Sequence, residues 1–319
     1  LIPLPLLGED TYVAQCMWGS SFDDIWIAGG SLPPAHWDGA TWTLHEEVEP
    51  WAAAAIWGSS PSAVFIGDVG TRLFKWNGLA FETLTTHAMF TYALHGLTAD
   101  HVFAVGFNNI AYWNGSTSVE EYSGDCYLND VFAVDDTGFA VGDAGCVLQR
   151  QGSNWDRMAT GVAVGLWAVV ARSATDVYAG GAGGTLLHYD GATWTRIPLA
   201  TQETIGSLAL TPNGQLLVAT ASETFQLDAR LITQRPTLPS QCEERENQHQ
   251  YTALAGAEGT LMALGPGSHA QYEGGRWHDS RWREAPTSFV GIVHDLWGAT
   301  PDAVWGAGSE HGMVFFDGT

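Results

Sequence analysis

The chain has 319 residues, and 45% of them are hydrophobic, which is ordinary for a globular protein and sufficient for a large buried core. Its formal net charge is −23, with 12 Lys and Arg against 35 Asp and Glu, and this charge argues against nucleic acid as a partner because the phosphates would be repelled. Anionic membrane surfaces are disfavoured for the same reason, and no apolar run approaches the ~18 residues that suggest a membrane span.

Along the chain, short apolar segments alternate with polar or glycine-rich turns. Predicted strands that each follow a polar turn lie at 25–27, 64–66, 102–104 and 304–305. The dipeptides that precede these turns are Trp18-Gly19, Trp57-Gly58, His95-Gly96 and Trp297-Gly298. The clearest unit spans 166–197, with predicted strands at 166–170, 177–179, 186–189 and 194–197. Four short antiparallel strands in one repeating unit are typical of a propeller blade.

A second sequence feature repeats in phase with the first. It is a polar residue followed by Gly, as in the hairpin turn Asp190-Gly191. The polar residues of the successive copies, including a degenerate sixth copy without the Gly, are at 38, 77, 114, 151, 190, 228, 273 and 317. By subtraction, these positions lie 39, 37, 37, 39, 38, 45 and 44 residues apart. We therefore predict an all-β fold, a β-propeller of eight four-stranded blades forming a single domain over 1–319, with seven blades as the alternative if the sixth unit merges with its neighbours.

The two ends of the sequence match each other. The last unit stops at 317–319, before a fourth strand, and the N-terminal residues Leu1-Ile2-Pro3-Leu4 resemble 196–199 of the fifth unit. We expect the N-terminal strand to complete the last blade, which would remove an open sheet edge. The alternative is an end without this pairing.

The four cysteines bear on the compartment of the protein. Cys126 and Cys146 fall near the same face of the fourth unit, which predicts a disulfide between them. An even number of cysteines in such a repeat favours an oxidising compartment, so we expect a secreted, cell-surface or periplasmic protein. Pairing of Cys16 with Cys242 stays open, and four buried thiols are the alternative.

In a propeller, the loops between the second and third strands and the loops that lead into the next blade lie on one face. Tryptophans at fixed repeat positions, such as Trp155 and Trp194, are expected to pack between blades, whereas residues outside the repeat are better ligand candidates. The candidates for ligand binding are Trp51, Tyr92, Asp125, His249, Tyr251 and Trp282. His249, His294 and His311 fall in late units and could hold calcium or zinc, or could instead be solvated or hydrogen-bonded. No other cofactor is expected.

The residues Trp57-Gly58-Ser59-Ser60-Pro61, the segment 64–67 and the turn 190–194 (DGATW) resemble a known repeat. It is the W-G-S-S-P-x-D-V-W-A-V-G…H-x-D-G-x-x-W repeat of secreted and surface bacterial propeller proteins. The resemblance covers nearly the whole chain and is weakest over 200–290. The chain is more distantly similar to the sialidase Asp-box and to propeller assembly factors of photosystem II, although here Gly directly follows the acid. The resemblance implies the fold and export, and it implies no catalytic residues.

The sequence contains no nucleophile elbow, P-loop, H-E-x-x-H or dinucleotide fingerprint. We therefore expect a non-catalytic binding or scaffold module that presents its loop face to a protein partner. A lectin that binds a surface glycan is one alternative, and a cation-dependent hydrolase or lyase with its site at the channel mouth is another. The sequence specifies neither the partner nor the oligomeric state.

Overall fold

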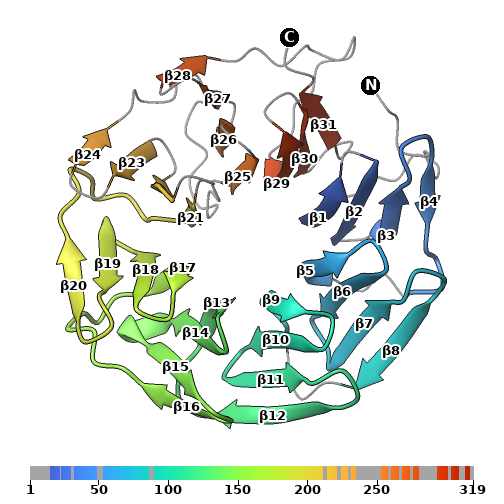
Figure 1. Ribbon diagram of the computed structural model, residues 1–319, viewed down its shortest axis with the longest axis horizontal. Coiled ribbons are helices and arrows are strands. Elements are labelled where there is room, and N and C mark those ends of the chain that lie inside the picture. Colours follow the sequence, from blue (N-terminus) through green and yellow to red (C-terminus); the bar gives the residue numbers. More distant parts are fainter. Residues whose placement is uncertain are drawn as a thin grey trace. The chain divides into compact units, whose positions relative to one another are not determined.

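The structure is a computed structural model. It describes residues 15–21, 23–29, 32–48, 53–85, 90–210, 214–220, 224–228, 231–234, 253–257, 260–265, 268–273, 276–279, 293–300, 303–308 and 313–316 (Figure 1). Within these ranges the chain forms β-strands and one 3-10 turn at Asp143–Gly145. Every sheet is antiparallel with strands in sequence order, and the described residues make seven four-stranded sheets and one three-stranded sheet. This confirms the all-β prediction.

The chain divides into two compact units. Unit 1 comprises Leu1–Pro50 and Ala209–Thr319, and unit 2 comprises Trp51–Leu208. The first sheet of unit 1 contains β1 (Cys16–Ser21), β2 (Asp24–Gly29), β3 (Leu32–Trp37) and β4 (Trp42–Leu44). The next sheet along unit 1, of which only Ser207 and Leu208 fall in unit 2, contains β21 (Ser207–Leu210), β22 (Leu216–Ala219), β23 (Thr224–Asp228) and β24 (Leu231–Gln234). The remaining sheets are β25 (Ala253–Ala257), β26 (Thr260–Gly265), β27 (Ser268–Glu273) and β28 (Arg276–Asp279), then β29 (Val293–Thr300), β30 (Ala303–Gly308) and β31 (Met313–Phe316).

Unit 2 is a run of four successive four-stranded sheets. The first contains β5 (Ala53–Ser60), β6 (Ala63–Asp68), β7 (Arg72–Trp76) and β8 (Phe81–Thr85), and the second contains β9 (Ala93–Thr98), β10 (His101–Gly106), β11 (Asn109–Trp113) and β12 (Ser118–Ser123). The third contains β13 (Leu128–Val134), β14 (Thr137–Gly142), β15 (Val147–Gln151) and β16 (Asn154–Arg157). The fourth contains β17 (Leu166–Ser173), β18 (Asp176–Gly181), β19 (Thr185–Tyr189) and β20 (Trp194–Ile197). These are the four strands per repeat that the sequence predicts.

The core of unit 2 lies between the facing sheets. The second strand of each sheet is buried along most of its length, which explains why β6, β10 and β14 are continuous apolar runs and do not alternate. Phe103 and Trp155 share the cluster between the second and third sheets, and Phe139 and Trp194 share the next cluster. The prediction that these tryptophans pack between blades is confirmed, since both are buried.

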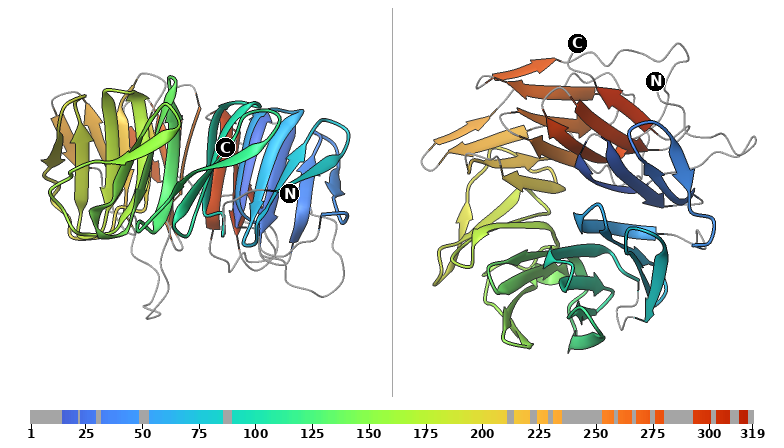
Figure 2. Two further views of the ribbon diagram at one scale, coloured as in Figure 1. Left: turned by 90° about the horizontal axis from the view of Figure 1, so that it is seen from below. Right: turned by 45° about the vertical axis from the view of Figure 1, so that its right-hand side comes forward.

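The connections of unit 2 gather at two ends, between which the strands run in the side view of Figure 2. At one end, here called the turn end, an Asp or Asn side chain closes each regular turn between the third and fourth strands. Asp190 Oδ1 accepts hydrogen bonds from the backbone N–H groups of Ala192 at 2.9 Å and Thr193 at 2.8 Å. Gly191 has a φ of +91°, and a Cβ atom there would lie 2.8 Å from the Cβ atom of Thr175, so the position requires glycine. Asn77 and Asn114 hold their turns in the same way.

The sixth repeat, which is degenerate in sequence, forms its own four-stranded sheet, β21–β24. The last sheet, β29–β31, is three-stranded in the described part of the chain. The N-terminal strand that we expect beside it, at residues 1–4, lies outside the described residues. The closed ring of eight blades therefore stays a prediction, as does the alternative of seven.

Candidate functional site

The opposite end of unit 2, here called the loop end, consists of the loops between second and third strands and the loops between sheets. Backbone hydrogen bonds join the two kinds of loop directly. Gly124 N–H donates to Asn108 O at 3.0 Å, and Asp143 N–H donates to Tyr127 O at 2.8 Å. Gly184 N–H likewise donates to Glu203 O at 2.8 Å. The two kinds of loop therefore share one face, as a propeller predicts, and they hold each other in place.

A disulfide adds a covalent link at this end. Cys126 and Cys146 are bonded to each other, with Cα atoms 6.1 Å apart, and both are buried. Cys126 belongs to the loop that leads into β13, and Cys146 follows the 3-10 turn between β14 and β15. The predicted disulfide is thus present, and disulfides of this kind persist in oxidising compartments. Cys16 is buried in β1, and its thiol donates to Ala28 O at 3.4 Å, whereas Cys242 lies outside the described residues.

Exposed aromatic side chains gather on these loops. Phe90, Phe107 and Tyr127 have exposed fractions of 41%, 42% and 49%. The ring centroids of Phe90 and Phe107 are 6.1 Å apart, and those of Phe107 and Tyr127 are 4.5 Å apart in an edge-on arrangement. We call these three residues the aromatic row. Tyr92 and Val164, also on the loop end, are 44% and 36% exposed. In the part of the chain that the structure describes, eight large hydrophobic residues are exposed, and five of them lie at this end.

Two of the sequence-predicted ligand residues lie at the loop end. Tyr92 precedes β9, and its backbone N–H donates to Val105 O at 2.8 Å. The carboxylate of Asp125 is 83% exposed and lies 3.5 Å from Arg157 Nη1. The other candidates, Trp51, His249, Tyr251 and Trp282, lie outside the described residues. Binding by any of the six stays a prediction.

Sequence reasoning missed all three members of the aromatic row. They could have been found by the criterion that selected Tyr92, because each is an aromatic residue in a loop and outside the repeated Trp positions. Phe107 directly precedes Asn108, and Tyr127 follows Asp125 by two residues.

The metal prediction is not tested by the structure. His294 is part of β29, but its side chain is not described, and His249 and His311 lie outside the described residues. Among the residues that the structure describes, no group of three or more His, Cys, Asp or Glu side chains is placed to hold a metal ion. Calcium or zinc binding at the late histidines stays a prediction.

Two Asp–His pairs recur in different sheets. Asp24 Oδ1 lies 2.7 Å from His36 Nε2, and in unit 2 Asp176 Oδ1 lies 2.9 Å from His188 Nε2. Burial opposes ionisation of Asp176, but hydrogen bonds from Arg172 and His188 hold its pKa below the ordinary value. Ser20 Oγ donates to Asp24 and not to a histidine, so it lacks the imidazole base that a serine nucleophile needs. These pairs connect second strands to third strands and serve packing.

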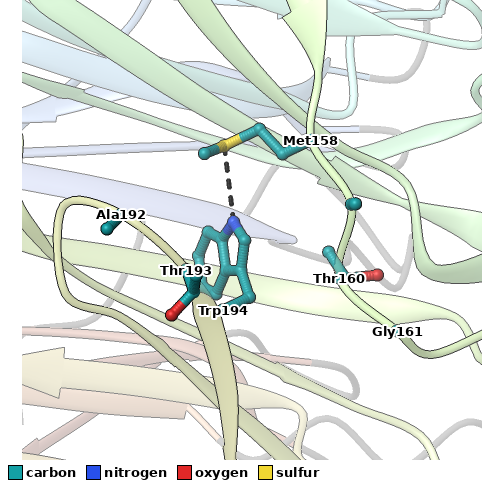
Figure 3. Close-up of a pocket in the computed structure, with 7 residues that line it drawn as sticks. Met158, Thr160, Gly161, Ala192, Thr193 and Trp194 are labelled. Carbon is teal, nitrogen blue, oxygen red and sulfur yellow. Dashed lines mark hydrogen bonds between the residues drawn. The ribbon is translucent and has the colours of Figure 1, made fainter.

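A shallow hollow lies on the outer part of unit 2, between the segment after β16 and the turn before β20 (Figure 3). Its volume is about 520 Å³, and its lining includes Met158, Thr160, Thr193 and Trp194. Trp194 Nε1 donates to the Met158 sulfur at 3.4 Å, so the only indole N–H of the lining is already engaged. The hollow offers little polar chemistry for recognition, and the aromatic row is the stronger candidate site.

No protein-family profile and no curated protein sequence matches the chain. Solved structures match it in fold at low sequence identity. The computationally designed Ika8 protein is 14% identical, with a TM-score of 0.76 over 99% of both chains. The extracellular domain of the putative one-component system BT4673 from B. thetaiotaomicron is 15% identical, with a TM-score of 0.60 over 99% of this chain and 39% of that chain. This chain therefore spans well under half the length of that domain.

A third similar structure is YCF48 bound to a D1 peptide, which is 12% identical, with a TM-score of 0.56 over 99% of this chain and 97% of that chain. The WD40 β-propeller domain of Doa1 also matches, at 9% identity and with a TM-score of 0.66 over 97% of this chain and 93% of that chain. At such identities the likeness concerns the fold alone, and together with the sheet topology it makes the chain a β-propeller protein. In the described ranges no helix is long and apolar enough to cross a membrane.

Proposed function

We propose that the chain is an exported, non-catalytic binding module that holds a protein partner against the loop end of unit 2. The aromatic row is the observation that carries this proposal. Aromatic side chains supply large contact areas at low entropic cost and are enriched where proteins bind each other. The loops beneath the row are joined by backbone hydrogen bonds and a disulfide, so little ordering would be needed on binding.

The geometry of the row favours a protein over a glycan. The ring planes of Phe90 and Phe107 are inclined by 47°, and those of Phe107 and Tyr127 by 80°. The three rings therefore share no plane on which successive sugar rings could stack. Two of the three are phenylalanines, which offer no polar atom to a sugar hydroxyl. A peptide with an apolar side chain fits such an uneven surface better.

The proposal also includes the eight-bladed ring completed by the N-terminal strand. Export and peptide binding draw support from similar structures, which include an extracellular domain and a propeller bound to a peptide. The disulfide between Cys126 and Cys146 supports export.

The test is a selection from a phage-displayed library of random peptides on the full chain. Binders are then compared on the wild type, on the double variant Phe107→Ser/Tyr127→Ser and on Leu79→Ser, a control at the turn end where Leu79 is 90% exposed. We expect peptides that bind the wild type and Leu79→Ser alike and that lose about thirtyfold in affinity on the double variant. Absence of row-dependent peptides, together with row-dependent signals on a glycan array, would replace this proposal with the lectin alternative.

A further inference from the structure

The charged residues in the described loops of the loop end are all acidic. Its described loops in unit 2, which connect second to third strands or one sheet to the next, include the carboxylates of Asp125, Asp143 and Glu203 and contain no Lys or Arg. Within these loops there is thus no positive charge to attract an acidic partner, whereas each charge present favours a basic one. The net charge of −23 on the whole chain acts in the same direction at longer range.

Three arginines adjoin these loops. Arg196, in β20, donates from Nη2 to Gly183 O at 3.3 Å, so its positive charge lies beside the loop 182–184 of the fourth sheet and not beside the loops of the aromatic row. Arg72, at the start of β7, donates from Nε to Asp68 Oδ2 at 2.7 Å, and Asp68 is buried, so this pair is an internal brace of the loop 69–71. Arg157, at the end of β16, approaches Asp125 only at 3.5 Å, and both side chains are largely exposed. An exposed pair of this kind is weak and open to exchange for another cation.

The carboxylates and the aromatic row meet at Tyr127. Asp125 precedes it by two residues, and the backbone N–H of Asp143 donates to the Tyr127 carbonyl oxygen at 2.8 Å. Asn129 Nδ2 donates to Asp143 Oδ1 at 3.1 Å and to Leu166 O at 2.9 Å, which ties Asp143 to the neighbouring sheet. Tyr127 is therefore an exposed aromatic residue on a loop that itself carries the exposed Asp125 and is joined by a backbone hydrogen bond to the loop of the exposed Asp143.

We infer that the occupant of the aromatic row is a cationic peptide segment, with an apolar side chain against Phe90 and Phe107 and a Lys or Arg at Tyr127 near Asp125 and Asp143. The face of an aromatic ring attracts a cation, and the two carboxylates add ion pairs to the same group. Repulsion by the same carboxylates excludes acidic segments, which gives the site selectivity as well as affinity. This inference rests on the proposed function and specifies the chemistry of its partner.

The experiment uses the peptides that the selection on the full chain enriches in a row-dependent manner. Their Lys and Arg content is compared with that of the unselected library, and their affinities are measured by fluorescence anisotropy on the wild type and on Asp125→Asn/Asp143→Asn. The matched control is Asp136→Asn, an exposed acid in the turn between β13 and β14 at the turn end. Circular dichroism melts check that each variant is folded.

We expect the row-dependent peptides to be enriched in Lys and Arg. Neutralising the two carboxylates should weaken binding about three- to tenfold and flatten its dependence on salt between about 50 and about 300 mM, whereas Asp136→Asn should change neither. Row-dependent peptides that are neutral or acidic, or that bind the Asp125→Asn/Asp143→Asn variant equally well, would overturn the inference while leaving the proposed function intact. Failure to recover any row-dependent peptide would instead count against both.

Discussion

At the turn end of unit 2, the same chemistry recurs from sheet to sheet. Asn77, Asn114 and Asp190 each accept two backbone N–H groups in their turns, and the glycine that follows each of them has a φ between +89° and +94°. At the loop end, by contrast, the side chains differ from sheet to sheet. What recurs there is the backbone bonding between neighbouring loops, while the exposed residues range from Phe107 and Tyr127 to Gly183.

The contrast separates the residues that maintain the fold from those that are available for the proposed binding. Hydrogen bonds to the side chains of Asn77, Asn114 and Asp190 maintain three of the four turns between third and fourth strands, so replacing these residues should weaken those turns. The loop end is maintained by backbone atoms and one disulfide, so its side chains can vary freely and can be exposed for binding. Substitutions between the sheets and toward the turn end should therefore lower the stability of the fold. Substitutions of exposed side chains at the loop end should instead weaken the proposed binding.

The largest loss of stability is expected for Glu121→Ala. The Glu121 carboxylate is 4% exposed and accepts from Arg150 Nε at 2.7 Å and Nη2 at 2.6 Å, and from Trp155 Nε1 at 3.2 Å. Arg150, only 11% exposed, would be left as a buried charge between the second and third sheets, which costs about 3–5 kcal/mol of the free energy of unfolding. Urea denaturation measures this change. Glu120→Ala removes an exposed neighbour and is the control, and equal losses in the two variants would contradict the prediction.

The second prediction concerns the disulfide of the loop end. Replacing Cys126 and Cys146 together by Ser removes a link between residues separated by 20 positions, and the expected loss is about 3 kcal/mol. The loop carrying Tyr127 should become more mobile, so amide hydrogen exchange should accelerate at 124–127 and 143–146 but not at the turn 190–193. Uniform acceleration at both ends would show that the disulfide stabilises the whole unit and not the loop end in particular.

The third prediction tests the interior between the two ends. Burial lowers the pKa of His95 to about 4, and its Nδ1 accepts the backbone N–H of Ala133 at 3.0 Å, which requires the unprotonated atom. The imidazole of His95 takes up a proton near pH 6.5 in the unfolded chain but only near pH 4 in the folded protein. His95 therefore does not change the free energy of unfolding at neutral pH, and it lowers this free energy progressively as the pH falls from about 6.5 toward 4. Between about pH 7 and about pH 5 the loss should be about 2 kcal/mol.

Denaturation at the two pH values, compared between the wild type and His95→Phe, isolates this contribution. The variant loses the acceptor for Ala133 and should be less stable at neutral pH, but its stability should fall less between the two values. His95 stacks on Phe132 with ring centroids 4.1 Å apart, and phenylalanine preserves that contact. Parallel pH profiles of the wild type and the variant would show that folding does not lower the pKa of His95.

The difference between the repeated turn end and the variable loop end also explains which features could be predicted from the sequence. Periodic residues such as Trp155, Trp194 and Asp190 predicted the four-stranded units, the packing and the turns, because each has the same role in successive sheets. The pairing of Cys126 with Cys146 followed from the same register. Phe90 and Phe107 were missed because their contact joins loops 17 residues apart, by subtraction, and depends on side-chain directions that no repeat specifies. Arg150 and Glu121 were missed for a related reason, since a single ion pair across two sheets leaves no periodic signal.

The smallest effect on stability is expected at the aromatic row itself. Phe107→Ser/Tyr127→Ser removes two side chains that are 42% and 49% exposed, so the free energy of unfolding should change by no more than about 1 kcal/mol. Because the row exposes apolar surface, the variant should also be more soluble and bind less of a hydrophobic dye such as ANS. Leu79→Ser, at an isolated position of the turn end, should change dye binding little. If the double variant lost as much stability as Glu121→Ala, the aromatic row would be part of the scaffold. The proposed division between an interior that stabilises the fold and a loop end that binds a partner would then be wrong.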